Sequence, residues 1–429
     1  MTTRSRPSVL PISSGFVGAP FFSQVSNAIS FICAGLNIVS DDLNFRLHKM
    51  SSSRGSNILS EDLYKLKQEP DHLLVLVHGI MASPSDWTYA KTELERQLGS
   101  NFLIYASSCN SYTKTFDGID RSGKRLANEV LSVVQNNGSL KRISFLAHSL
   151  GGLFTRYAIA VLYSSDNLQE DLHEGSKIEN SKLESSLKQG RIGGLEPISF
   201  ITLATPHLGV RGKKQLPFLL GLHILERLAP PLAPIIVRRT GRQLFLTDDK
   251  PNKPPLLLRM ASDCEDFKFI SSLASFRNHV LYANVSYDHM VGWRTSSIRR
   301  ETELAKPSLR SLDGYNHVVH VEYCPPIQSE APHFPSEAAK AKEAAQTASN
   351  TQKTEEYYEL MEEEMIHGLQ RIGWKKVDVN FHSATWPFFA HNNICVKNQW
   401  LYYAGAGVIA HVADNLKEQE SRPFIVANL

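Results

Sequence analysis

The segment KRISFLAHSLGG, residues 141–152, constrains the fold of this chain more than any other. An apolar, β-rich run breaks at AHSLG, residues 147–151, and a long apolar helical stretch follows at once. A serine on a sharp turn from a strand into a helix is typical of a nucleophile elbow, where the serine backbone is strained and its neighbours are small. Ala147 replaces the more usual first glycine with the next smallest residue. Alternatively, Ser149 only caps the following helix, so the pattern needs support from elsewhere.

A second motif, HLLVLVHGIM at residues 72–81, supplies that support. Its continuous apolar run is typical of a central parallel strand that is buried on both faces. The run ends in His78 and Gly79, and glycine permits unusual dihedrals, so we expect the backbone N–H of Ile80 to point into a cleft as an oxyanion donor. The second expected donor is the backbone N–H of Leu150, directly after the candidate nucleophile.

Apolar strands alternate with amphipathic helices from about Ile58 onward, which predicts an α/β fold: a mostly parallel sheet with helices on both faces. Further strands are expected within residues 102–107, 197–209, 279–287 and 375–382, and helices within 83–98 and 120–136. A helix after residue 356 places Tyr358, Met361, Met365 and Leu369 on one side.

The expected organisation is one large domain, residues 58–429, preceded by an N-terminal extension, residues 1–57. The polar stretch 164–196 reads as a surface insertion. A cap insertion is expected at about residues 208–260, and a flexible excursion rich in Ala, Ser, Glu, Gln and Lys at about 325–356.

Composition narrows the class of protein. A hydrophobic content of 42%, a charged content of 21% and a net charge of +3 are ordinary for a globular protein, and no basic block indicates nucleic acid. The five cysteines are scattered, odd in number and without a C-x-x-C pair. We therefore expect a reducing, intracellular setting with neither a disulfide framework nor a metal site.

The first forty residues contain no Asp or Glu, are rich in serine and include Arg4 and Arg6. This bias resembles an organelle transit peptide, so a plastid is one expected location and the cytosol is the alternative. The other interpretation of these residues is a disordered extension. The uncharged stretch 21–39 is interrupted by Ser, Gln and Asn, so it makes a poor membrane-spanning helix.

A serine nucleophile needs a base and an acid, and in the α/β-hydrolase fold these follow in the order Ser, acid, His, each after a strand. Asp288 directly follows the strand expected at 279–287, so we favour it over Asp263 and Asp266, which precede a helix-like stretch. His391 lies on the loop beyond the last strand and is favoured as the base, although His382 at the strand end also fits the spacing.

Other histidines are expected to have structural roles. His148 should point away from Ser149 and pack or hydrogen-bond under the sheet, and His78 and His207 should brace loops. No histidine pair shows metal-ligand spacing with Cys or acidic residues, so no metal and no cofactor is expected.

Taken together, HLLVLVHGIMASPSDW, LAHSLGG, ITLATPHLG, YDHMVGWRTSSI and AHNNI resemble the lipase-like "putative serine esterase" family of plants and fungi. The likeness runs from about Asp71 to the carboxyl terminus. It implies an α/β-hydrolase fold, a triad of Ser149, Asp288 and His391, and hydrolysis of carboxylic esters. Fungal members act on monoacylglycerols or phospholipids, which implies lipid acyl esters as substrates.

The expected partner is a lipid or small ester substrate. The apolar, proline-rich segment 216–237 lies where this fold places its cap, so a lid that contacts a membrane or lipid-droplet surface is one interpretation; an ordinary buried helix pair is the other. Two further functions stay open: transfer of the acyl group to another alcohol, and a non-catalytic hydrolase-fold binding protein.

Overall fold

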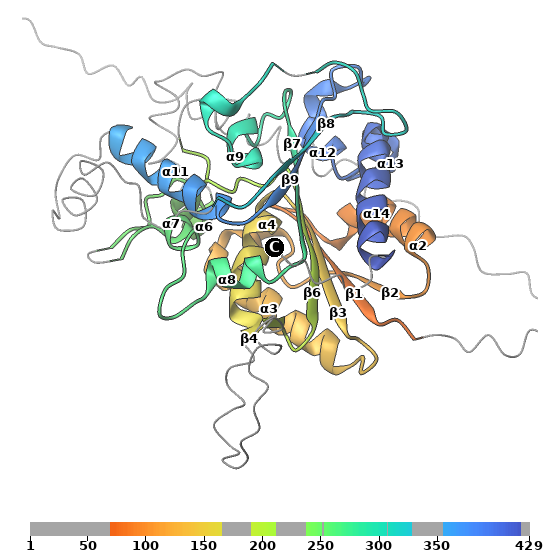
Figure 1. Ribbon diagram of the computed structural model, residues 1–429, viewed down its shortest axis with the longest axis horizontal. Helices are drawn as coiled ribbons and strands as arrows, with labels where there is room; N and C mark the ends of the chain where they lie inside the picture. Colours follow the sequence, from red (N-terminus) through yellow and green to blue (C-terminus); the bar gives the residue numbers. More distant parts are fainter. Residues whose placement is uncertain are drawn as a thin grey trace, which may run out of the picture. The chain divides into compact units, whose positions relative to one another are not determined.

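The computed structural model describes residues 69–164, 190–211, 237–250, 253–306, 308–327 and 355–421 (Figure 1). Contacts divide the chain into Met1–Lys65 and Leu66–Leu429, and all described residues belong to the second unit. The expected N-terminal extension therefore lies outside the described residues, as do residues 212–236 of the expected cap and 328–354 of the expected excursion.

A seven-stranded sheet forms the centre of this unit, with the strand order β2-β1-β3-β6-β7-β9-β8. Its strands are β1 (His72–Val77), β2 (Phe102–Ala106), β3 (Arg142–His148), β6 (Glu196–Leu203), β7 (Asn278–Asn284), β8 (Val318–Cys324) and β9 (Trp374–Val379). All neighbouring pairs are parallel except β8 with β9, which is antiparallel. A separate two-stranded pair joins β4 (Tyr163–Ser164) to β5 (Arg191–Ile192).

The central strands are buried on both faces. In β1, Leu73 and Val75 belong to one hydrophobic cluster, whereas Leu74 and Leu76 belong to the other. Successive side chains of a strand point to opposite faces, so a continuous apolar run requires a layer of helices on each side.

Helices supply the two layers. One cluster contains the buried side chains of α3 (Ile119–Gln135), α4 (Leu150–Leu162) and α8 (Phe269–Ala274). The other contains those of α2 (Thr88–Leu98) and α14 (Ala406–Ser421). Figure 1 shows these two groups on opposite sides of the sheet.

Shorter helices and one long helix cover the rest of this unit. They are α6 (Arg238–Leu244), α7 (Leu256–Arg259), α9 (Trp293–Ser297), α11 (Glu355–Gln370), α12 (Ala390–Asn393), α13 (Gln399–Tyr402) and the 3-10 helices η1 (Pro84–Trp87), η2 (Tyr112–Phe116), η7 (Glu301–Glu303), η8 (Pro387–Phe389) and η9 (Tyr403–Gly405). The four residues expected on the apolar side of the helix after 356 lie in α11, and all four are buried.

The predicted architecture is confirmed: this is an α/β-hydrolase fold, and strands occupy every range expected from the sequence. The sequence analysis did not predict β8, the antiparallel edge strand. Only Val318 and Val319 of β8 are buried, so its sequence lacks the apolar run that marks the central strands. Among the described helices, none has the length and apolar character needed to cross a membrane.

Candidate active site

The turn between β3 and α4 holds Ser149 in a strained backbone conformation, with φ 56° and ψ −131°. Such a positive φ is uncommon outside glycine and persists only where surrounding contacts enforce it. Here the Ser149 N–H donates to the carbonyl of Leu203 in β6 at 2.8 Å, and the Thr205 hydroxyl donates to the Ser149 carbonyl at 2.9 Å. The end of β6 and the loop that follows it therefore hold both the backbone N–H and the backbone carbonyl of Ser149.

Glycines in and beside the turn allow neighbouring segments of the backbone to approach it closely. A Cβ on Gly151 would lie 2.5 Å from the carbonyl oxygen of Val77, and a Cβ on Gly152 would lie 2.2 Å from the hydroxyl oxygen of Thr205. A Cβ on Gly79 would lie 2.7 Å from the Ser149 Cβ. The end of β1, the turn and the start of α4 are thus packed at distances that only glycine permits.

A hydrogen-bonded relay links three side chains that are far apart in the sequence. The Ser149 Oγ lies 2.9 Å from Nε2 of His391, and Nδ1 of His391 lies 3.0 Å from Oδ2 of Asp288. All three side chains are buried. They follow the carboxyl ends of β3, β7 and β9, and parallel strands bring those ends to one edge of the sheet.

Asp288 is held by hydrogen bonds to both carboxylate oxygens. Oδ1 accepts the backbone N–H groups of Met290 and Val291, each at 2.9 Å, while Oδ2 accepts the side-chain amide of Asn284 at 2.8 Å besides the imidazole N–H. Burial alone would raise the pKa of Asp288, but the charge of His391 and these hydrogen bonds outweigh it and lower the pKa. The carboxylate is therefore ionised at neutral pH.

His391 is fixed through its own backbone as well as through its ring. The Nε2–H of His148 donates to the carbonyl of His391 at 2.8 Å, and the two rings lie 4.7 Å apart. Burial lowers the pKa of His148 well below its usual value, and the neighbouring imidazole lowers it further, so His148 is neutral. The expectation that His148 packs or hydrogen-bonds under the sheet is wrong, because its hydrogen-bond partner is His391 at the carboxyl edge of the sheet. His148 directly precedes Ser149, so it lies within reach of His391, which hydrogen-bonds to the serine.

The expected oxyanion donors lie beside the serine. Leu150 begins α4 directly after Ser149, and the close approach of Gly79 to Ser149 brings the loop containing Ile80 next to the turn. The following residue, Met81, has φ 51° and donates its N–H to the hydroxyl of Thr115 at 3.1 Å, which anchors this loop to η2.

The competing candidates lie elsewhere. The imidazole that hydrogen-bonds to the Ser149 hydroxyl is that of His391, while the backbone N–H of His382 donates to the side-chain oxygen of Asn380. Asp263 accepts the N–H groups of Ile270 and Ser271 at the start of α8, so its carboxylate is occupied in capping that helix.

The expected loop-bracing histidines both make local contacts. His78 Nδ1–H donates to the carbonyl of Gly79 at 3.1 Å, and His207 Nε2 lies 3.0 Å from the hydroxyl of Thr202. Within the described ranges, no group of three or more His, Cys, Asp or Glu side chains is arranged to hold a metal ion.

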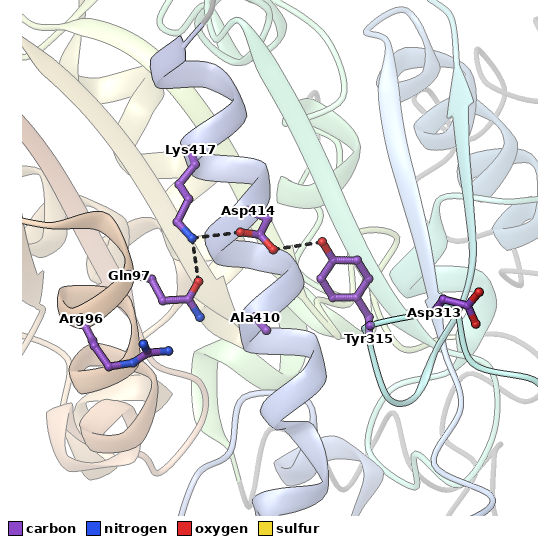
Figure 2. Close-up of a pocket in the computed structure, with 8 residues that line it drawn as sticks. Arg96, Gln97, Asp313, Tyr315, Ala410, Asp414 and Lys417 are labelled. Carbon is purple, nitrogen blue, oxygen red and sulfur yellow. Dashed lines mark hydrogen bonds and ion pairs between the residues drawn. The ribbon is translucent and has the colours of Figure 1, made fainter.

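A surface hollow of about 580 Å³ lies away from this site (Figure 2). It is lined by Arg96, Gln97, Asp313, Gly314, Tyr315, Ala410, Asp414 and Lys417. Asp414 accepts hydrogen bonds from Tyr315 and Lys417, each at 3.0 Å, and Lys417 also donates to Gln97 at 2.8 Å. These four polar side chains therefore bind one another between α2, α14 and the turn before β8.

The fold and the buried Ser–His–Asp relay define the class: an α/β hydrolase with a serine at its nucleophile elbow. The chain belongs to the family described as "Putative serine esterase (DUF676)", whose profile matches residues 67–298, more than half of the chain. The matched range includes Ser149 and Asp288 but ends before His391. The assignment of the histidine therefore depends on the geometry.

Two curated relatives are similar over a little more than half of the chain. "Putative lipase C4A8.10" of Schizosaccharomyces pombe is 27% identical over 266 residues, which cover 59% of this chain and 30% of the relative. "Putative lipase YDL109C" of Saccharomyces cerevisiae is 27% identical over 250 residues, which cover 56% and 33%. The chain thus spans about a third of the length of these relatives.

Among solved structures, the Bacillus licheniformis lipase BlEst2 in its propeptide form is similar at 17% identity and a TM-score of 0.30. The match covers 50% of this chain and 36% of that one. A TM-score of this size supports no argument about function.

Proposed function

We propose that this chain is a carboxylic ester hydrolase in which Ser149 is the nucleophile, His391 the general base and Asp288 the residue that orients the base. One observation carries the proposal: a continuous line of hydrogen bonds runs from the Asp288 carboxylate through the His391 ring to the Ser149 hydroxyl. A serine hydroxyl is a poor nucleophile near neutral pH, and this arrangement is the one that activates it.

The direction of proton transfer follows from the hydrogen bonds. An ionised carboxylate only accepts, so His391 Nδ1–H donates to Asp288, and Nε2 keeps its lone pair for the Ser149 proton. Attack of Oγ on the ester carbonyl then leaves a positively charged imidazole beside Asp288. That imidazole returns its proton to the leaving alcohol, and water resolves the acyl-enzyme by the reverse steps.

The backbone N–H groups of Ile80 and Leu150 are the proposed oxyanion donors. They belong to rigid parts of the fold, since the loop of Ile80 is packed on the turn and Leu150 opens α4. Donors fixed before the reaction stabilise the developing charge without reorganisation, and one such donor is worth roughly 10²–10³-fold in rate.

For the substrate, we infer lipid acyl esters of the monoacylglycerol or phospholipid type. The support is the family resemblance and the similarity to relatives that are named lipases. An intracellular setting is inferred from the cysteine pattern of the sequence. Acyl transfer to an alcohol other than water uses the same acyl-enzyme, so product analysis with a competing alcohol distinguishes it from hydrolysis.

Turnover of a water-soluble aryl ester by the purified full chain tests the proposal. Ser149→Ala should lower the rate by at least about 10⁴-fold, because loss of the nucleophile leaves only binding and oxyanion stabilisation. His391→Ala should have a comparable effect, whereas His382→Ala is the matched histidine control and should stay near the wild-type rate. Wild-type turnover in Ser149→Ala, or equal losses in the two histidine variants, would overturn the proposal.

A further inference from the structure

A surface rich in exposed aromatic side chains surrounds the segment that contains His391. We call it the aromatic surface; it consists of Trp386, Phe388, Phe389, Trp400, Leu401 and Tyr403. Trp400 is 97% exposed and Phe388 63% exposed. Six large apolar side chains exposed within residues 386–403 exceed ordinary surface composition and mark an interaction surface.

The aromatic surface is continuous with the catalytic site. Phe388 and Phe389 lie in η8, immediately before α12 and His391, and Phe389 contacts Tyr402 of α13 at 5.7 Å between ring centroids. The Phe388 ring also lies 5.9 Å from Tyr287 and 6.0 Å from His289, the two neighbours of Asp288 in sequence. A partner that covers this surface therefore lies next to the loops that hold the base and the acid.

The charge pattern indicates what kind of partner fits. Between Asp378 and Asp414 the sequence contains no acidic residue, and its one lysine, Lys397, forms an ion pair with Asp86. Figure 1 places α12 and α13 together at the end of the molecule where α14 begins. A segment that exposes Trp, Tyr, Phe and Leu and itself carries no acidic side chain suits the headgroup region of a lipid bilayer. Aromatic rings are favoured there because they combine an apolar body with a polar edge.

We propose that the aromatic surface docks this chain on a phospholipid bilayer and thereby presents the site at Ser149 to esters that reside in the membrane. This inference rests on the proposed ester hydrolysis for its biological meaning. Docking itself is a binding event that is measurable without any reaction. Trp400 and Trp386 insert at the interface, and the short segments η8 and α13 carry the contact.

Tryptophan fluorescence offers a direct readout. Of the five tryptophans, Trp87 and Trp374 are buried and Trp293 is half-buried, so the two exposed ones both lie in the aromatic surface. Vesicles of diether phosphatidylcholine, which carry no ester to hydrolyse, should shift the emission to shorter wavelength. Brominated acyl chains should quench it.

The matched control is an exposed aromatic residue at the opposite edge of the sheet. Tyr323 is 68% exposed and pairs with Lys375 near the start of β9, whereas the aromatic surface follows the end of that strand. The test variant is Trp386→Ser combined with Trp400→Ser, and the control is Tyr323→Ser. Trp400→Ser alone serves if the double variant does not fold, because its side chain is almost fully exposed.

In the double variant, the fraction that sediments with the same vesicles should fall by about tenfold or more, because each substitution removes a large apolar contact with the lipid. Tyr323→Ser should bind vesicles as the wild type does, and all variants should turn over a soluble ester at wild-type rates. Equal vesicle binding by the double variant and the wild type overturns the docking surface. The docking surface is also overturned if light scattering shows a dimeric wild type and a monomeric double variant, because the surface then binds a second copy of the chain.

The two proposals fail separately. Vesicle binding without soluble-ester turnover in the wild type would contradict the ester hydrolase and leave docking intact. Soluble-ester turnover without vesicle binding would contradict docking and leave the hydrolase intact.

Discussion

Replacing Gly151 with alanine should damage both the stability of the fold and the geometry of the site. The new Cβ would lie 2.5 Å from the carbonyl oxygen of Val77 and 2.6 Å from that of His78, both backbone atoms of β1 or the residue directly after it. Ordinary contact begins at 3.4 Å. The helix and the strand must therefore separate by about 1 Å, and overpacking on this scale costs about 1–3 kcal/mol of unfolding free energy.

The same separation moves the loop after β1 relative to Ser149. Because a misplacement of about 1 Å at a catalytic group can cost about 10²-fold in rate, Gly151→Ala should lower soluble-ester turnover by roughly that factor. Gly138→Ala is the matched control, since its Cβ meets nothing within 4 Å, and its stability should change by less than about 1 kcal/mol.

Urea denaturation and ester turnover, measured on both glycine variants, test the predicted losses of stability and activity. The reasoning predicts a lower midpoint and slower turnover for Gly151→Ala only. Identical midpoints and rates in the two variants would refute the close packing of the turn on β1.

Three further predictions concern ionisation. Asp288→Asn should lower ester turnover by about 10³–10⁴-fold, because the amide no longer stabilises the charged His391; steady-state kinetics on a folded variant check this, and a loss under tenfold would contradict it. Asn284→Asp places a second carboxylate against Asp288, which raises the pKa of the pair and should shift the acid limb of the pH–rate profile to higher pH; an unmoved limb would count against the contact. Burial lowers the pKa of His279 to about 4, so its stabilising contribution is present above pH 6.5 and is lost as the pH falls through 4. Each pKa unit is worth about 1.4 kcal/mol, so unfolding free energies at pH 7 and pH 4.5 should differ less in His279→Gln than in the wild type.

Sequence reasoning predicted the centre of the fold because burial on both faces leaves a strong local signal. The run at residues 72–77 is apolar throughout except for its first histidine, and every residue of β1 is buried. The edge strand β8 carries no such signal, because one long side of it faces away from the sheet and charged residues are tolerated there. Its pairing with β9 depends on tertiary contacts that the local pattern does not encode.

The expected site residues were found by two kinds of reasoning. The elbow serine follows from a local pattern, whereas Asp288 and His391 follow from their order after strands, and the structure brings the three side chains within hydrogen-bond distance. The residues around them were missed. Asn284 is a polar residue at the end of an apolar strand, four positions before Asp288, and that placement was a usable signal. The contact of His148 with His391 joins residues 243 positions apart, and no spacing rule predicts it.

The central claim is that the buried imidazole of His391 makes the Ser149 hydroxyl reactive. Labelling of the full chain with a fluorophosphonate, followed by mass spectrometry of the peptides, tests this claim most directly. The account predicts one phosphonylated residue, Ser149, and a labelling rate that falls by at least about 10³-fold in His391→Ala and remains unchanged in His382→Ala. Phosphonylation of another serine, or undiminished labelling of Ser149 in His391→Ala, would contradict it.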